Sequence, residues 1–260
     1  MARPIDRRYL LAGLGTAGVG TLLAACGGGD GDGASPSSSG SGGSGGSATT
    51  AGTAATGAGD VAALFDEATS CALTPEQTEG PFYIDVDAVR SDIREDREGV
   101  PLRLGVRVLD EACAPVPDAI VEVWHCDATG LYSGFEAASR GGSGGGGGEG
   151  GDGTRYLRGG QATDGDGIAQ FTTVYPGWYQ GRTIHVHAKA HVGNGEVLTT
   201  QLYFDEDVTA AVQEREPYAS DTGRDTFNDD DGIFSDATLL TLSEDGDGYL
   251  GLITLTVDRS

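Results

Sequence analysis

Short runs of alternating hydrophobic and polar residues fill the chain from about residue 100 to its end. In the stretch 102–109, apolar Leu and Val residues alternate with Arg and Gly, as they do on a β-strand that buries one face. Similar runs occupy 119–124, 168–174, 183–192, 197–204 and 249–257. Helical periodicity is weak and confined to two short stretches, 61–68 and 207–214. The pattern predicts an all-β protein with few short helices.

Turn residues separate these runs. Pro and Asp fill 115–118, and Asp-Gly repeats or Gly-Asn-Gly fill 164–167, 193–195 and 245–248. Short strands with this punctuation favour a single β-sandwich domain over residues 60–260. A tract with ten glycines in thirteen residues, 141–153, interrupts that domain, and we expect it to be a flexible loop.

Residues 1–26 have the pattern of an export signal. Arg7 and Arg8 precede an apolar stretch, Leu10 to Ala25, whose 16 residues are too few to span a bilayer comfortably. The arginine pair resembles a twin-arginine signal. The ending Leu-Ala-Ala-Cys26 resembles a bacterial lipobox, in which the cysteine is lipidated. We therefore expect an exported protein anchored to the outer face of the bacterial cell membrane through Cys26; an ordinary signal peptide with an incidental cysteine is the alternative.

Residues 27–59 consist almost wholly of Gly, Ser, Ala, Thr and Asp. Such a segment cannot bury enough apolar area to offset its chain entropy, so it is predicted to be a disordered linker. At about 5–6 Å × √n, its 33 residues give a root-mean-square reach of about 30 Å. A lipid anchor, a flexible tether and a folded domain form a consistent layout.

Three cysteines remain in the domain, Cys71, Cys113 and Cys126, and export permits one disulfide. Cys113 and Cys126 lie at opposite ends of a predicted strand about 23 Å long, whereas a disulfide requires Cα atoms within about 7 Å. Cys71 is therefore the expected partner. Cys71–Cys113 is favoured over Cys71–Cys126, because Cys113 lies in an exposed turn and Cys126 follows an apolar strand, where it is expected to be a buried thiol.

The charge of the chain excludes some classes of partner. The 16 Lys and Arg residues stand against 40 Asp and Glu residues, a formal net charge of −24. Nucleic-acid binding requires a basic footprint that displaces counterions, and this chain has none. Adhesion to anionic lipid headgroups is unfavourable for the same reason, so we expect membrane association only through the lipid anchor.

Four histidines provide the candidate chemistry. His185 and His187 share one face of a predicted strand, because side chains alternate along a strand, and two neighbouring imidazoles can bind one metal ion. Just upstream, a Pro-Gly turn precedes Tyr179 and Arg182, and another strand ends in a turn that carries Tyr132. His125 is expected to be structural or to support the site, and His191 to be a solvated surface residue.

These residues resemble the signature of the intradiol ring-cleavage dioxygenases, which include catechol 1,2-dioxygenases and protocatechuate 3,4-dioxygenases. The matching elements are Tyr132, the Pro-Gly-Trp-Tyr segment 176–179, and the Arg-Thr-Ile-His-Val-His segment 182–187. The stretch 74–83 resembles the entry segment of that family, and Gln201 matches a glutamine that lies near the substrate in its members. The resemblance covers about residues 71–257.

The resemblance implies a non-haem Fe(III) enzyme with one iron per chain. Its ligands would be Tyr132, Tyr179, His185 and His187, and phenolate is a hard oxygen donor that suits ferric iron. The substrates would be a catechol and O2, and the product a cis,cis-muconate-type diacid. Tyr179 would leave the metal and accept a substrate proton, Arg182 would stabilise negative charge on the ring, and Gln201 would bind substrate.

One alternative function remains open at this stage. A tethered β-sandwich at the cell surface could be a non-catalytic binding module, since a fold does not determine a function. The assembly is expected to be a monomer or weak oligomer, because only about ten residues, 60–69, precede the Cys71 segment, whereas catechol 1,2-dioxygenases generally carry an N-terminal helical region that forms a dimer.

Overall fold

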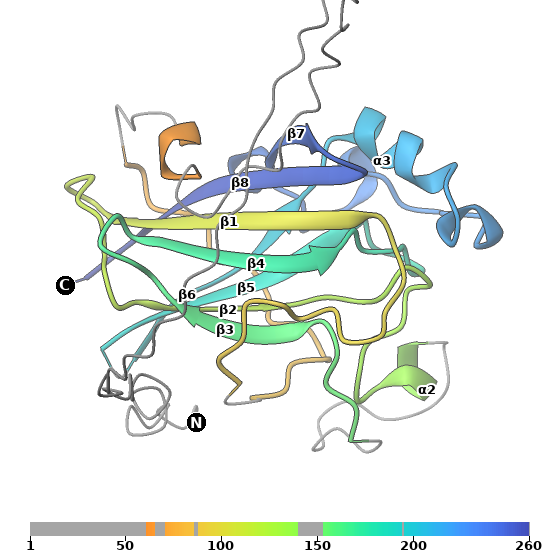
Figure 1. The fold of residues 1–260 in the computed structure, drawn as a ribbon, viewed down its shortest axis with the longest axis horizontal. Coiled ribbons are helices and arrows are strands. Elements are labelled where there is room, and N and C mark those ends of the chain that lie inside the picture. Colours follow the sequence, from red (N-terminus) through yellow and green to blue (C-terminus); the bar gives the residue numbers. More distant parts are fainter. Residues whose placement is uncertain (1–60, 66–70, 86–87, 140–152, 194, 260) are drawn as a thin grey trace, which may run out of the picture. The chain divides into compact units, whose positions relative to one another are not determined.

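Two four-stranded sheets lie one above the other in the protein (Figure 1). The structure, a computed structural model, describes residues 61–65, 71–85, 88–139, 153–193 and 195–259. The predicted signal peptide, linker and lipidated Cys26, and the glycine tract up to residue 152, lie outside these residues. The all-β sandwich predicted from the hydrophobic pattern is confirmed.

The first sheet has the strand order β4-β1-β8-β7 and the second β3-β2-β5-β6. All neighbouring strands pair antiparallel except β1 and β8, which pair in parallel from Leu102–Tyr249 to Asp110–Val257. The strands are β1 (Pro101–Asp110), β2 (Ile120–Trp124), β3 (Arg158–Ala162), β4 (Ile168–Val174), β5 (His185–Val192), β6 (Gly195–Tyr203), β7 (Thr241–Asp245) and β8 (Gly248–Val257).

Helices are few and short in the described residues. They are the α-helices α2 (Glu136–Ser139) and α3 (Glu206–Gln213), and the 3₁₀ turns η1 (Ala62–Leu64), η2 (Tyr218–Ser220), η3 (Asn228–Asp230) and η4 (Asp236–Thr238). Helix α3 begins where Asp205 caps it, accepting hydrogen bonds from the backbone N–H groups of Asp207 and Val208. No helix in this part of the chain is long and apolar enough to cross a membrane.

The inner faces of both sheets build the hydrophobic core. Leu104 and Val106 of β1 and Val121 and Val123 of β2 are each at most 1% exposed and belong to one cluster of buried side chains. Burial of a Val or Leu side chain stabilises a fold by about 1.5–3 kcal/mol, so these alternating positions hold the two sheets together.

The opposite face of the second sheet is buried as well. Val186, Ala188 and Ala190 of β5 join the sandwich core, so the alternating His185, His187 and Lys189 point away from it, yet the latter three are only 2–3% exposed. The N-terminal segment 74–83 covers them. It contacts the free edge of β6, where Gln77 donates its backbone N–H to Thr199, and ends over β2, where the Tyr83 hydroxyl donates to Glu122.

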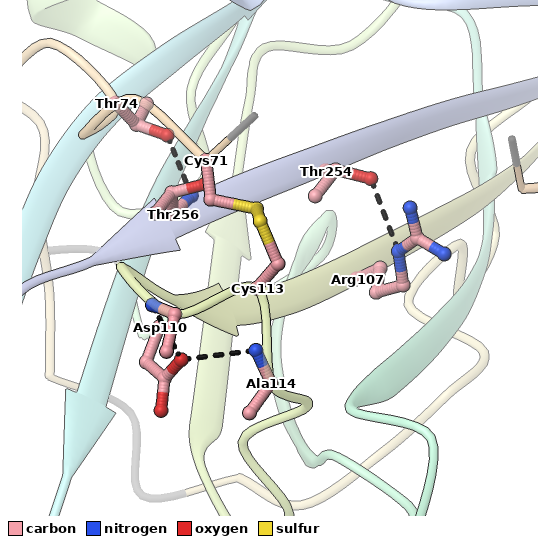
Figure 2. The surroundings of a disulfide bond; sticks show 9 residues. Cys71, Thr74, Arg107, Asp110, Cys113, Ala114, Thr254 and Thr256 are labelled. Atoms are coloured by element: carbon pink, nitrogen blue, oxygen red, sulfur yellow. Dashed lines mark hydrogen bonds between the residues drawn. A yellow bond between two sulfur atoms is a disulfide. The ribbon is translucent and has the colours of Figure 1, made fainter. Parts of the chain in front are cut away.

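A disulfide between Cys71 and Cys113 ties the start of this covering segment to the turn after β1 (Figure 2). The two Cα atoms are 5.4 Å apart, and Cys126 is a buried free thiol, in line with the favoured pairing. Next to the disulfide, Thr74 accepts the backbone N–H of Thr256 and donates its own N–H to the carbonyl of the same residue. The segment that covers the His face is thus fixed at its first residues to β8 and to the β1–β2 turn.

Two strands have no alternating pattern in the sequence. Strand β3 reads Arg-Gly-Gly-Gln-Ala, and a Cβ on Gly159 would lie only 2.7 Å from Ile93 Cγ2, so glycine permits the segment around Ile93 to pack on this strand. Strand β7 lies at a sheet edge, with three of its five residues exposed. In the predicted helix 61–68, only Ala62–Leu64 forms a 3₁₀ turn among the described residues.

Candidate metal centre and active site

His185 and His187 open strand β5 and point to the same side of the sheet. Each residue is 2% exposed, and their Nε2 atoms lie 3.1 Å apart. Burial lowers the pKa of His185 to about 3 and the pKa of His187 well below its usual value, with the positive charges of neighbouring side chains adding to the effect. Both imidazoles are therefore neutral at physiological pH, which is the state that ligates a metal ion.

Different contacts orient the two rings. The Nδ1 atom of His185 lies 2.7 Å from the carbonyl oxygen of Thr183, so Nδ1 carries the proton and Nε2 presents its lone pair to the site. The Nδ1 atom of His187 has no hydrogen-bond partner within the described part of the chain. Its ring instead stacks on the indole of Trp124, with centroids 4.8 Å apart and planes inclined by 5°.

Gly80 of the covering segment limits the space around His187. A Cβ at Gly80 would stand 3.2 Å from the His187 Cε1 atom, and the Gly80 backbone has a φ of +72°. Glycine at this position therefore lets the covering segment pass close to the imidazole, which packs against both Trp124 and Gly80.

Tyr179 and Tyr132 complete the group. The Tyr179 hydroxyl lies 3.2 Å from His185 Nε2, and the Tyr132 ring packs edge-on against Tyr179 with centroids 5.7 Å apart. Burial raises the pKa of Tyr179 to about 12, opposed by the nearby Arg182, and raises the pKa of Tyr132 well above its usual value. Tyr132 is fully buried, and its hydroxyl has no hydrogen bond of standard geometry among the described residues.

Two glycines bring the tyrosine loops together. Tyr132 follows β2 and Tyr179 follows β4, so their loops come from different sheets. A Cβ on Gly130 would lie 2.2 Å from the carbonyl oxygen of Trp178, and a Cβ on Gly177 would lie 2.3 Å from that of Ala128. The loops therefore touch backbone to backbone, an approach that only glycine permits at these two positions.

The measured separations among three of the four donor atoms suit ligands of a single metal ion. Two ligand atoms about 2.1 Å from one ion and at right angles to each other are about 3 Å apart, close to the measured separations of 3.1 Å between the histidine nitrogens and 3.2 Å from His185 Nε2 to the Tyr179 hydroxyl. A trivalent cation also compensates for the cost of burying phenolates, and hard oxygen donors favour Fe(III). Three clustered His, Cys, Asp or Glu side chains occur nowhere in the described residues, so a site of that composition is absent there.

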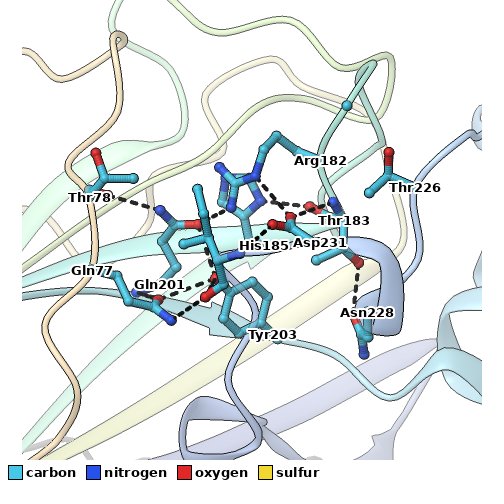
Figure 3. A network of polar contacts seen from close by, with 12 residues as sticks. Gln77, Thr78, Arg182, Thr183, His185, Gln201, Tyr203, Thr226, Asn228 and Asp231 are labelled. Atoms are coloured by element: carbon cyan, nitrogen blue, oxygen red, sulfur yellow. Dashed lines mark hydrogen bonds and ion pairs between the residues drawn. The ribbon is translucent and has the colours of Figure 1, made fainter.

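Arg182 and Gln201 lie beside His185 of this group (Figure 3). Arg182 Nη2 donates to Gln201 Oε1 at 2.5 Å, and the guanidinium charge opposes the rise in the pKa of Tyr179 and adds to the fall in the pKa of His185. Gln201 is fully buried, and its Nε2 donates to the carbonyl of Thr78 at 2.9 Å. Its amide is thus engaged by the protein itself, and direct contact of Gln201 with substrate stays a prediction.

The other singled-out residues lie around the site. The ring nitrogens of fully buried His125 lie 2.7 Å from the Cys126 carbonyl and 2.7 Å from Thr173 Oγ1, a structural role, and burial lowers its pKa to about 4. The Cys126 thiol is buried and donates to the Gly177 carbonyl. The surface position expected for His191 is wrong. Its side chain is 14% exposed, and Nε2 lies 3.5 Å from Glu122 Oε2, because the covering segment shields this face.

Sequence reasoning missed three contributors to the site. Trp124 and Gly80 hold His187, and Asp231 accepts a hydrogen bond from Arg182 Nε at 2.9 Å. Asp231 ends a run of three aspartates after Asn228, and no local pattern distinguishes the inward-facing one. Trp124 lies in the predicted strand 119–124 and Gly80 in the stretch 74–83, but His187, against which both pack, is distant from them in sequence.

The chain is similar to known dioxygenases over most of its folded domain. The model of a family described as dioxygenase matches residues 75–222, more than half of the chain. Catechol 1,2-dioxygenase 1 from Acinetobacter lwoffii is 28% identical over 157 residues, which are 52% of this chain and 47% of that protein. Catechol 1,2-dioxygenase from Pseudomonas sp. (strain EST1001) is 37% identical over 75 residues, 27% of this chain and 25% of that protein. The chain thus spans half or less of the length of these curated relatives.

Solved structures align over most of the domain. An intradiol ring-cleavage dioxygenase from Tetranychus urticae is 33% identical, with a TM-score of 0.67, over 72% of this chain and 95% of that chain. The dioxygenase domain of a dioxygenase and carbohydrate-binding protein fusion from the cellulolytic bacterium Streptomyces sp. SirexAA-E is 29% identical, with a TM-score of 0.54, over 73% of this chain and 100% of that chain.

Proposed function

The chain belongs to the intradiol ring-cleavage dioxygenase family, and from this premise we propose that it uses one ferric ion to cleave catechols between their two hydroxyl-bearing carbons. Both atoms of O2 are incorporated, and the product is a cis,cis-muconate-type diacid. The observation that carries the proposal is the convergence of two neutral imidazoles and two phenols at one end of the sandwich. All four donors come from one chain, so a monomer or weak oligomer would suffice.

The protein side chains divide the work. His185, His187, Tyr132 and Tyr179 would hold the ion, whose chemistry when bound is withdrawal of electron density from the two catechol oxygens. Tyr132 is fully buried, whereas Tyr179 is partly exposed. The Tyr179 oxygen is therefore the better placed of the two to accept a proton from an incoming catechol hydroxyl.

Arg182 supplies a fixed positive charge next to Tyr179. Its side chain is 16% exposed, and burial weakens solvent screening, so its charge acts strongly on groups nearby. Negative charge that builds up on the substrate ring during cleavage would be stabilised by this guanidinium. Phe82 of the covering segment stacks on the Tyr132 ring with centroids 4.7 Å apart, so this segment keeps bulk water from the Tyr132 side of the site.

The activity is tested with the purified full chain loaded with ferric iron. We expect a red-brown protein, because Fe(III)–tyrosinate absorbs visible light, a shift of that band on anaerobic addition of catechol, and uptake of one O2 per catechol. Catechol, hydroxyquinol, protocatechuate and substituted catechols form the substrate panel. A colourless protein with stoichiometric iron would refute the tyrosinate ligands, and iron-loaded protein that turns over none of these compounds would favour the binding-module alternative.

We further propose that the protein is exported and held at the outer face of the cell membrane by lipidated Cys26. The Cys71–Cys113 disulfide supports an oxidising compartment, because disulfides persist outside the cytosol. In cells, Cys26→Ser should release the protein from the membrane fraction and abolish its labelling by radioactive palmitate. Retention of both properties by the variant would contradict the anchor.

A further inference from the structure

Arg182 has a carboxylate on one side and an amide on the other (Figure 3). Its Nε donates to Asp231 Oδ2 at 2.9 Å, and its Nη2 donates to Gln201 Oε1 at 2.5 Å. Nη1 has no hydrogen-bond partner within the described residues. Two of the three guanidinium nitrogens are thus held by the protein, and one remains for a ligand.

Asp231 is itself rigidly placed. Its side chain is 3% exposed, Oδ2 also accepts the backbone N–H of Thr183 at 2.9 Å, and Oδ1 accepts that of Ile233 at 2.9 Å. Burial opposes ionisation, but the hydrogen bonds from Ile233, Thr183 and Arg182 outweigh it and hold the pKa of Asp231 below its usual value. The carboxylate is therefore ionised at neutral pH and cannot turn away from Arg182 without losing two backbone hydrogen bonds.

Gln201 is equally constrained on the other side. Its backbone N–H donates to Gln77 Oε1 at 2.9 Å, and the Tyr203 hydroxyl lies 3.2 Å from Gln201 Oε1, as it does from Gln77 Oε1 and the Ile233 carbonyl. With Nε2 bound to the Thr78 carbonyl, the amide can present only its oxygen to Arg182. The covering segment thereby fixes one side of the guanidinium.

We propose that Asp231 is a positioning residue that, together with Gln201, orients Arg182 so that its free Nη1 edge faces the bound catechol. The proposal rests on the proposed function, and it assigns Gln201 to the support of Arg182 in place of substrate contact. A planar guanidinium that is hydrogen-bonded through two of its nitrogens cannot rotate within the site. The Arg182 charge is therefore already in position where negative charge develops on the substrate ring during cleavage.

The kinetic test replaces Asp231 in the iron-loaded full chain. Asp231→Ala should lower kcat about 30-fold, since misplacement of a catalytic group by about 1 Å costs on the order of 100-fold. The iron content should be unchanged, and the Kd for catechol, from anaerobic titration of the visible band, should change less than about threefold, because Arg182 acts on charge that appears only after binding. Asp231→Asn, which keeps an acceptor oxygen, should recover part of the loss.

A double-mutant cycle separates positioning from general damage. If Asp231 acts through Arg182, then Asp231→Ala added to Arg182→Ala should lower kcat less than about threefold further, because coupled residues are not additive. Asp205→Ala is the matched control, since Asp205 also accepts two backbone N–H groups but lies at the start of α3. It should lower the thermal midpoint and leave kcat unchanged. The proposal would be overturned if Asp231→Ala kept more than a third of the wild-type kcat. It would also be overturned if the losses in kcat of Asp231→Ala and Arg182→Ala multiplied in the double variant.

A structural measurement tests the contact independently of turnover. In the full chain loaded with diamagnetic gallium(III), the ¹⁵N-detected Arg182 Nε–H signal should exchange slowly with solvent, and it should become fast in Asp231→Ala. The signal is assigned by its loss in Arg182→Lys. If the gallium form of the wild type gives a slow signal but its iron form turns over no catechol, the Asp231–Arg182 contact is present and the proposed function is rejected. A fast signal in the wild type would reject the role of Asp231.

Discussion

His187→Ala is expected to remove ferric iron from the protein and to abolish ring cleavage. The substitution deletes one of four protein ligands, and the loss of a residue that merely supports a ligand already weakens metal binding by about 10–100-fold. We expect iron retention to fall by more than about 100-fold, the red-brown colour to disappear and kcat to drop below detection. Iron per chain after dialysis against a weak chelator, together with the visible spectrum, measures the effect.

His191→Ala is the matched control for this experiment. His191 lies on the same strand and the same face, four residues after His187, but its nearest charged partner is Glu122 at 3.5 Å. The control should retain iron, colour and turnover. Circular dichroism of both variants distinguishes loss of a ligand from loss of the fold. Full iron content with normal turnover in His187→Ala would place the metal elsewhere in the chain.

Gly130→Ala is expected to destabilise the protein by about 3 kcal/mol or more and to separate the two tyrosine loops. The left-handed backbone at Gly130, with φ of +77°, costs an alanine about 1–2 kcal/mol. The new Cβ would also lie 2.2 Å from the Trp178 carbonyl oxygen, and relief of such an overlap by backbone movement costs a further 1–3 kcal/mol or so. Because that movement shifts Trp178 and its neighbour Tyr179, iron retention should fall as well. Urea unfolding and iron analysis provide the measurement.

Gly246→Ala isolates the effect of the backbone conformation. Gly246 also has a positive φ, +61°, but no atom lies within 4 Å of its added Cβ, and the residue occupies the β7–β8 hairpin. This control should lose about 1–2 kcal/mol of stability and keep its iron. Equal losses of stability and iron in the two variants would show that loop contact at Gly130 has no special importance.

The hydrophobic pattern predicted six of the eight strands, because each of the six buries alternate side chains in the sandwich core. The pattern at β5 carried further information. Its outward positions are His185, His187 and Lys189, and a polar row of this kind, together with the motifs that carry Tyr132 and Tyr179, predicted the proposed iron site. Local residue order was sufficient in these cases because the spacing of two along a strand already determines which side chains share a face.

Strand β3 and the supports of the site could not be predicted in this way. Gly159 lies in β3 because Ile93 packs against it, and Gly80 is required because His187 lies beneath it. Asp231 meets Arg182 across 49 residues of sequence. Each of these contacts joins residues from separate elements, so no periodicity along the chain contains them.

The amino-acid sequence by itself determined the sandwich class, the family and the residues that could ligate iron, since these depend on residue type and short-range spacing. The tertiary structure decided how the predicted ligands meet and what holds them: the backbone contacts at Gly130 and Gly177, the covering segment over His187, and the hydrogen bonds from Arg182 to Asp231 and Gln201. The physical reason is that close packing and burial are set by the distance between chain segments, and that distance exists only after the two sheets have packed together.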